Sequence, residues 1–216
     1  MSQKEFLSKL ENSIIQGDKD KAESLAKEAV EKQLDLNEVI EKGYIPGIQK
    51  VGELWEKGEY FLPELITSAE CMKAAMGVLH PELEKAQIKT RSRGKIIIGT
   101  VEGDIHDIGK NLVSSMLSAN GFDVIDLGAD VKLEMFIEKA EKENADFICL
   151  SALLTTTMVG QKRLVEMLKE KNLSDRFKVM VGGAPVNQKW ADDIGADGYA
   201  ENAMIAVQAV NSLINK

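Results

Sequence analysis

The sequence predicts an α/β protein in two parts: a four-helix bundle in residues 1–90 and a flavodoxin-like or Rossmann-like domain in residues 91–216, with a doubly wound, five-stranded parallel sheet. Three observations lead to this fold class. Apolar residues recur at helical spacing through the first 90 residues. After Gly94 the pattern changes to short apolar runs that alternate with helical stretches. Small and hydroxyl-bearing residues follow most of these runs, as expected at the carboxyl ends of parallel strands.

Four helices with short loops are expected in the N-terminal part, which favours an antiparallel bundle. A capping box at residues 2–5 begins the first helix. Gly17 ends this helix, and Asp18 can cap the second. Asn37 can cap the third helix.

Proline and glycine divide the rest of this part. Pro46 should kink or split the third helix, because proline lacks an amide hydrogen and clashes with the preceding turn. That helix should stop near Gly58, and the fourth should begin near Pro63. The polar segment 81–94 resembles a linker between the two parts.

Strand and helix alternate five times in the C-terminal part, which predicts a parallel sheet with helices on both faces. The expected strands are 95–99, 122–127, 146–150, 179–181 and 198–200, and the expected helices are 111–119, 133–143, 158–171, 188–194 and 202–214. With strand order 2-1-3-4-5, the chain would leave the first and third strands in opposite directions. That point is where open α/β sheets bind ligands.

Composition excludes several classes of function. The sequence has 35 acidic and 27 basic residues and a net charge of −8, which disfavours binding to nucleic acid or to an anionic membrane surface. No apolar run is long enough for a membrane span. The polar N-terminus lacks a signal peptide, and the two cysteines have no motif spacing. We therefore expect a reduced, cytoplasmic protein.

The sequence contains two histidines, His80 and His106, so a zinc site with three or four protein ligands is nearly excluded. His106 lies in the loop after the first expected strand, and nearby Asp104 is able to accept the second ring N–H, an arrangement typical of metal-binding histidine. One protein ligand is enough when a macrocycle holds the metal, as in haem or a corrinoid. The alternative interpretation is a solvent-exposed turn histidine.

Three sequence blocks together resemble the signature of base-off/His-on cobalamin-binding domains. They are Asp104-x-His106-x-x-Gly109, Ser151-x-Leu153 and Gly182-Gly183. The stretch 52–64 is similar to the helical cap module that precedes this domain in cobalamin-dependent methionine synthase and in corrinoid proteins of methanol and methylamine metabolism. The two resemblances cover nearly the whole chain, and they fit best the free-standing corrinoid proteins that serve methylated amines.

The resemblance implies a role for each matching residue. His106 would replace the cofactor's own base as the lower axial ligand of cobalt, Asp104 would be its carboxylate partner, and Thr157 would end the relay with its hydroxyl. The displaced nucleotide would thread beside the third and fourth strands, where the glycine pair would leave room for its ring. That pair alone is also typical of an ordinary turn. The full set of implied cofactor-binding residues is Gly103, Asp104, His106, Asp107, Gly109, Ser151, Leu153, Thr155, Thr157, Gly182 and Gly183.

The function implied is that of a corrinoid methyl carrier rather than a complete enzyme. It would bind cobalamin and cycle between Co(I) and methyl-Co(III), moving a methyl group from a methylated amine to an acceptor such as tetrahydrofolate or a thiol coenzyme. The implied partners are a substrate-specific corrinoid methyltransferase, an acceptor methyltransferase and a reductive activase. Apolar side chains of the fourth helix (Leu62, Leu65, Met72 and Met76) would either shield the cofactor or form the core of the bundle.

Two other functions remain open at this point. A cobalamin-binding sensor or regulator uses a similar pair of modules, but it normally adds a DNA-binding or signalling segment. The cobalamin subunit of a carbon-skeleton mutase shares the histidine motif, but it usually lacks the helical cap.

Overall fold

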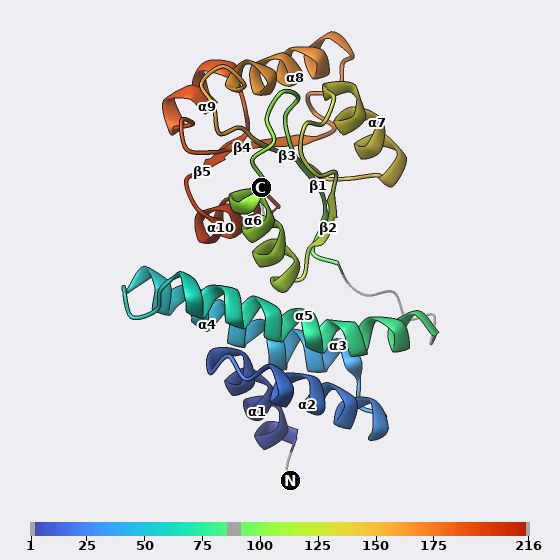
Figure 1. Cartoon of the computed structure of the whole chain (residues 1–216). Helices are drawn as coiled ribbons and strands as arrows, with labels where there is room; N and C mark the ends of the chain where they lie inside the picture. Colours follow the sequence, from blue (N-terminus) through green and yellow to red (C-terminus); the bar gives the residue numbers. More distant parts are fainter. Residues whose placement is uncertain (1–2, 86–91, 215–216) are drawn as a thin grey trace. The chain divides into compact units, whose positions relative to one another are not determined.

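The computed structural model describes residues 3–85 and 92–214, which form two compact units, one helical and one α/β (Figure 1). The helical unit contains α1 (Gln3–Ile15), α2 (Lys19–Glu31), α3 (Leu36–Val39), the π-helical turn η1 (Ile40–Tyr44), α4 (Ile45–Glu56) and α5 (Leu62–Lys85). The α/β unit contains β1 (Lys95–Thr100), α6 (Ile108–Ala119), β2 (Asp123–Asp126), α7 (Leu133–Glu143), β3 (Phe147–Ser151), α8 (Met158–Glu170), β4 (Lys178–Gly182), α9 (Gln188–Ile194), β5 (Gly198–Ala200) and α10 (Ala203–Ile214).

The core of the helical unit forms where α2 packs against α5 and α1 against α4. Tyr44 is fully buried, and its hydroxyl donates to the Ala22 carbonyl at 2.6 Å. Gly47 allows α4 to approach α1 closely, because a Cβ there would lie 2.7 Å from the Glu11 carbonyl oxygen. Of the apolar residues of α5 considered above, Leu65 and Met72 are buried, whereas Leu62 is exposed.

The expected interruption at Pro46 is confirmed, since η1 ends two residues before it and separates α3 from α4. The predicted cap at Asn37 is wrong. Asp35 is the cap, and one of its carboxylate oxygens accepts hydrogen bonds from the Asn37 and Glu38 amides at 3.0 and 3.2 Å. Part of the expected capping box at residues 2–5 lies outside the described residues.

The predicted linker at residues 81–94 begins too early. Helix α5 continues through Pro81 to Lys85. Leu79 and Leu83 are four residues apart and both fully buried, so the apolar stripe of the helix continues past the proline. Residues 86–91 of that segment lie outside the described residues.

The α/β unit has the predicted parallel sheet, in the order β2-β1-β3-β4-β5. Helices α6 and α10 lie on one face, and α7, α8 and α9 lie on the other (Figure 1). Phe136 and Ile137 of α7 pack with Ile97, Ile148 and other strand residues in one buried cluster. The sheet is therefore covered on both faces, which leaves its carboxyl edge for ligands.

Both cysteines are free thiols in buried positions, Cys71 in α5 and Cys149 in β3. Burial raises the pKa of the Cys71 thiol to about 11 and that of the Cys149 thiol to about 12. Both are therefore protonated at neutral pH. Over residues 3–85 and 92–214, no helix has the length and apolar character required to cross a bilayer.

Candidate functional site

His106 lies in the loop that joins β1 to α6, at the carboxyl edge of the sheet. Its side chain is 48% exposed, and its Nδ1 lies 2.8 Å from Oδ1 of Asp104. This contact uses one ring nitrogen and leaves Nε2 for another partner. The residue therefore has the arrangement of a metal-binding histidine held by a carboxylate.

Asp104 is fully buried and anchors this loop. Its Oδ1 also accepts the His106 amide at 3.1 Å, and its Oδ2 accepts the Leu153 amide at 2.7 Å and the Thr157 hydroxyl at 2.7 Å. Burial alone would raise the pKa of this carboxyl, but the hydrogen bonds from Thr157, Leu153 and His106 outweigh burial and hold the pKa well below its usual value. Because an ionised carboxylate only accepts hydrogen bonds, the proton of the imidazole lies on Nδ1.

Thr157 lies at the start of α8 and is buried. Its hydroxyl oxygen is 2.7 Å from Asp104 and 2.9 Å from the Leu154 carbonyl oxygen. The three residues of the expected relay, His106, Asp104 and Thr157, are thus connected by hydrogen bonds. They come from two different loops, after β1 and after β3.

Two residues that the sequence analysis did not identify also hold the histidine loop. The hydroxyl of buried Thr100 donates to the His106 carbonyl at 2.9 Å. Asp130 accepts the Gly103 amide at 2.8 Å, and its own amide donates to the Asp104 carbonyl at 2.9 Å. The sequence could have indicated Thr100, because it is a polar residue directly after an expected apolar strand, whereas nothing in the sequence pattern indicated Asp130.

Ser151 and the glycine pair lie together at the ends of β3 and β4. Ser151 is opposite Thr100 on one side and Gly182 on the other. A Cβ at Gly183 would lie 1.8 Å from the Ala152 carbonyl oxygen, and the φ of Gly183 is +126°. No residue with a side chain would fit at Gly183, because the backbone at the end of β4 lies close to Ala152 there. That the glycine pair leaves room for a ring stays a prediction.

Asp107, Gly109 and Thr155 are exposed. The Asp107 carbonyl accepts the Asn111 amide at 2.7 Å, so α6 begins earlier than predicted and includes Gly109. A Cβ at Gly109 would contact nothing within 4 Å. In the described part of the chain, the side chains of Asp107 and Thr155 do not join the hydrogen-bond network around His106.

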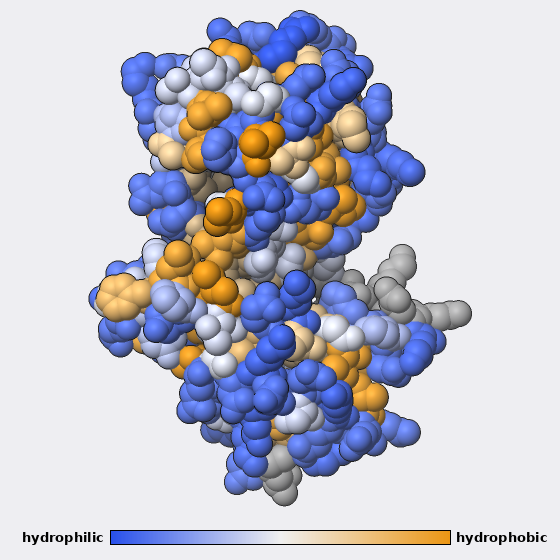
Figure 2. All heavy atoms as spheres, in the orientation of Figure 1, coloured by the Kyte–Doolittle hydropathy of each residue, from blue (hydrophilic) through white to orange (hydrophobic). Residues whose placement is uncertain are grey.

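Four apolar side chains in the segments that follow β1 and β3 are exposed. Ile105 is 77% exposed and Ile108 87%, while Leu153 and Leu154 are 39% and 42% exposed. Elsewhere hydrophilic residues cover much of the surface visible in Figure 2, with apolar residues grouped between them. Exposed apolar side chains at a ligand-binding edge indicate an extended, partly apolar ligand.

The donor set decides which metal group fits. In residues 3–85 and 92–214, no cluster of three or more His, Cys, Asp or Glu side chains is arranged to hold a metal ion. One imidazole with Nε2 left for a partner, in a segment that also carries exposed apolar side chains, fits a metal macrocycle that brings its own equatorial ligands. The residues present thus fit a corrinoid.

A buried glutamine connects the ends of β3 and β4. The side chain of Gln161 in α8 donates to the Leu150 and Gly182 carbonyls, both at 3.0 Å, and accepts the Trp190 indole N–H at 3.0 Å. Its amide group is fully satisfied by these contacts, so it fixes the position of the strand ends beside the site.

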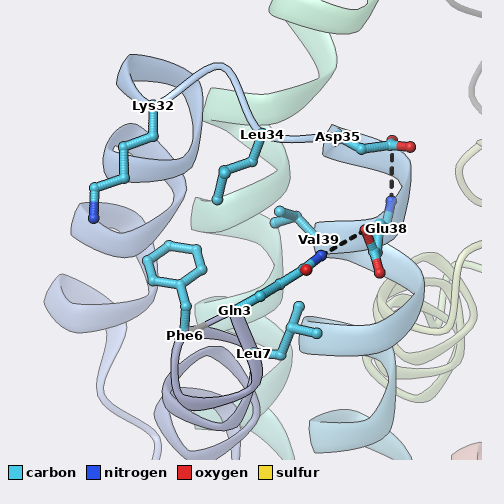
Figure 3. A pocket seen from close by; sticks show the side chains of 8 residues that line it. All are labelled: Gln3, Phe6, Leu7, Lys32, Leu34, Asp35, Glu38 and Val39. Carbon is cyan, nitrogen blue, oxygen red and sulfur yellow. Dashed lines mark hydrogen bonds between the residues drawn. The ribbon is translucent and has the colours of Figure 1, made fainter. Parts of the chain in front are cut away.

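A separate hollow of about 280 Å³ lies in the helical unit, between α1 and the segment from α2 to α3 (Figure 3). It is lined by Gln3, Phe6, Leu7, Lys32, Leu34, Asp35, Glu38 and Val39. Its polar side chains already bind partners within the protein: Gln3 donates to Glu38 at 2.9 Å, and Lys32 pairs with Glu28. It therefore lacks converging free groups that would orient a ligand.

Comparison with known proteins agrees with this chemistry. Residues 94–208 and residues 7–80 each match a family model described as a B12 binding domain. The chain is 51% identical to a corrinoid protein of Desulfitobacterium hafniense, over 98% of both chains. It is 50% identical to a trimethylamine corrinoid protein of Methanosarcina acetivorans, over 97% of both. The solved methanol:cobalamin methyltransferase complex of Methanosarcina barkeri contains a chain that superimposes with a TM-score of 0.86 at 30% identity, covering 99% of this chain and 81% of that one.

Proposed function

The chain belongs to the corrinoid proteins with B12-binding domains, and we propose that it is a methyl carrier for methylated amines. It receives a methyl group from the amine through one methyltransferase and delivers it through a second to tetrahydrofolate or a thiol coenzyme. The trimethylamine corrinoid protein among its relatives supports the choice of donor. The solved complex of a related chain supports partnership with a methyltransferase, and we extend the proposal to a reductive activase.

The observation that carries the proposal is the hydrogen-bonded chain from His106 through Asp104 to Thr157. We propose that His106 binds the cofactor in the base-off/His-on mode through Nε2. Bound cobalamin would supply the methyl-transfer chemistry of its cobalt, and His106 would hold it. The protein's part is to set how strongly His106 donates, and it does so with the Asp104 carboxylate behind the ring.

The low pKa of Asp104 defines where a proton is held. Because the carboxyl stays ionised at neutral pH, a proton on this chain of residues is held by the imidazole. His106 Nδ1–H then donates to Asp104, and Nε2 is the ring atom that would bind the cofactor. Thr157 donates to the other carboxylate oxygen and keeps Asp104 oriented while Nε2 changes partners.

We propose that the displaced nucleotide of the cofactor lies along the ends of β3 and β4, where it contacts Ser151, Leu153, Thr155, Gly182 and Gly183. A glycine is required at position 183, because a Cβ there would collide with the Ala152 backbone. The α/β residues 91–216 are the cofactor-binding domain in this proposal, and residues 1–90 are its helical cap.

Labelling tests the axial ligand directly. The protein is prepared with ¹⁵N-histidine, loaded with unlabelled cobalamin and reduced to the Co(II) state. Electron paramagnetic resonance should show the doublet splitting of a ¹⁵N ligand, because the nitrogen comes from the protein. A triplet from the cofactor's own ¹⁴N base would overturn the His-on assignment.

Methyl transfer tests the carrier function. Cobalamin-loaded protein is mixed under reducing conditions with a trimethylamine or dimethylamine corrinoid methyltransferase and its amine, and the corrinoid spectrum is followed. We expect amine-dependent methylation that His106→Ala slows strongly. The control contains the same methyltransferase and amine, with free cobalamin in place of the cobalamin-loaded protein. Absence of methylation with every methylated amine would refute the donor, and a requirement for an adenosyl cofactor would favour the mutase alternative.

A further inference from the structure

The histidine loop is held by two side chains that lie outside the motif, Thr100 and Asp130. The Thr100 hydroxyl donates to the His106 carbonyl at 2.9 Å. Asp130 binds the loop twice, through its carboxylate to the Gly103 amide at 2.8 Å and through its own amide to the Asp104 carbonyl at 2.9 Å. These contacts touch the backbone on both sides of the histidine.

Hydrogen bonds join the histidine loop to two neighbouring segments, one after β3 and one after β2. The Asp104 side chain binds the segment after β3, through Leu153 and Thr157. The Asp104 backbone binds the segment after β2, through Asp130. The segment after β2 is itself joined to β1, because the Thr100 amide donates to the Gly128 carbonyl at 3.0 Å and the Val131 amide donates to the Thr100 carbonyl at 3.1 Å. The direction of the Asp104 carboxylate is therefore fixed from both sides of the loop.

The backbone of Asp130 is in the left-handed region, with a φ of +54°. This conformation is unfavourable for most residues with a side chain, although Asp and Asn tolerate it better than others. Unfavourable backbone angles persist where the surrounding contacts require them, and they gather at functional sites. Here the angle brings the carboxylate and the amide of the same residue onto adjacent residues of the histidine loop.

We propose that Asp130 and Thr100 are positioning residues that hold His106 in the orientation needed to ligate cobalt. This inference rests on the proposed function, because it takes His106 as the axial ligand. The contacts of Thr100 and Asp130 described above are with backbone atoms of the loop, so replacing either residue leaves the imidazole and the Asp104 carboxylate chemically intact. Their loss frees the loop backbone, so that a larger share of the bound corrinoid is without the histidine ligand.

The test uses cobinamide, a corrinoid without a nucleotide base, so that a nitrogen ligand in its visible spectrum comes from the protein. Asp130→Gly removes the carboxylate while keeping the positive φ accessible, and Asp130→Asn keeps an acceptor oxygen and tolerates the same φ. We expect Asp130→Gly to lower the equilibrium constant for histidine ligation on the order of tenfold, the effect of one lost charge-assisted hydrogen bond. Asp130→Asn should stay close to the wild-type protein.

A second pair of variants examines Thr100. Thr100→Val removes the hydroxyl with little change in shape, and Thr100→Ser keeps it. We expect a several-fold loss of ligation for the valine variant and recovery in the serine variant. In the cofactor-free protein, the Gly103 amide should exchange its hydrogen faster in Asp130→Gly than in Asp130→Asn, because its acceptor is gone.

His106→Ala distinguishes a failure of the proposed function from a failure of the positioning role. If its cobinamide spectrum equals that of the wild-type protein, His106 is not the ligand and the proposed function fails. If His106→Ala loses the ligand but Asp130→Gly and Thr100→Val keep it fully, the positioning role alone is refuted. Lower thermal stability with an unchanged ligated fraction also refutes it. Should Asp130→Gly fail to fold, the Thr100 pair decides by the same spectrum.

Discussion

The helical unit and the α/β unit bury polar groups in different ways. In the helical unit the buried hydroxyls of Ser13, Tyr44 and Ser68 each donate one hydrogen bond to a helix carbonyl. The α/β unit buries an ionised carboxylate, Asp104, whose two oxygens accept several hydrogen bonds. Isolated hydroxyls support packing, whereas a connected set of buried polar groups fixes one particular arrangement. Among the described residues, the connected set of buried polar groups lies in the α/β unit.

The two tryptophans allow each unit to be followed separately. Trp55 belongs to α4 and Trp190 to α9. In a Trp55→Phe background the fluorescence reports on the α/β unit, and in a Trp190→Phe background it reports on the helical unit. Urea unfolding of the cofactor-free protein, followed with these two probes, measures the free energy of unfolding of each unit.

The largest effect is expected for Asp104→Ala. The change leaves the Leu153 amide, the Thr157 hydroxyl and the His106 imidazole without their buried acceptor, which should cost about 4 kcal/mol in the free energy of unfolding. Ser68→Ala in the helical unit removes one hydrogen bond to Ile14 and should cost about 1 kcal/mol. Equal losses in the two units would contradict the distinction drawn between them.

The next effect concerns two glycines with positive φ. In Gly183→Ala the new methyl group would collide with the Ala152 backbone in addition to the strained φ, and we expect a loss of about 3 kcal/mol. Gly58 in the helical unit has a φ of +71° but open space around it, so Gly58→Ala should cost about 1 kcal/mol. If Gly183→Ala is as stable as Gly58→Ala, the backbone at the ends of β3 and β4 shifts at little cost in free energy, contrary to this prediction.

Alkaline pH tests a property that both units share, the buried thiol. The pKa of Cys149 is raised to about 12, above its value of about 8.5 in the unfolded chain, so the unfolded state loses its proton first as the pH rises. The contribution of this thiol to the free energy of unfolding is fully present below pH 8.5, and the free energy of unfolding falls by about 2 kcal/mol by pH 10. Cys149→Ala should flatten this dependence for the Trp190 probe, and Cys71→Ala should flatten it for the Trp55 probe. A pH dependence that survives both changes would assign it to other groups.

The smallest effect is expected for surface ion pairs, which should behave alike in both units. Lys27 pairs with Glu23 in α2 at 2.6 Å, and Lys189 pairs with Asp193 in α9 at 2.6 Å. Exposed pairs of this kind contribute little to stability. Lys27→Ala and Lys189→Ala should leave both unfolding midpoints unchanged within error. A clear shift in one unit would mean that the units differ at their surfaces as well as in their interiors.

Much of the fold was predictable because hydrophobic patterns act over short distances. The apolar run from residue 95 became β1, and the alternation of runs and helices predicted the parallel sheet. The strand order 2-1-3-4-5 was an assumption, and the structure has it. Helix ends were harder. Asp35 rather than Asn37 is the cap, because both residue types favour this position and the sequence pattern does not choose between them. Buried Leu83 carried α5 past Pro81, where tertiary packing outweighs the local signal.

The site was predictable where a side chain binds another side chain at fixed spacing, as His106 and Asp104 do. Asp130 was not predictable, because it binds backbone atoms that approach only after the sheet has formed. The close contact at Gly183 has the same origin, since it depends on how β4 lies against Ala152. Contacts with backbone across strands leave no pattern in the sequence.

The two buried cysteines bear on chemical self-protection. A protein that transports an activated methyl group toward nucleophiles is at risk of alkylating itself, and a thiolate is the most reactive nucleophile that a side chain offers at neutral pH. Cys71 and Cys149 are the two cysteines of the chain, and both are buried and protonated. In the proposed carrier, the fold thus keeps both thiols away from the methyl group that the protein would deliver.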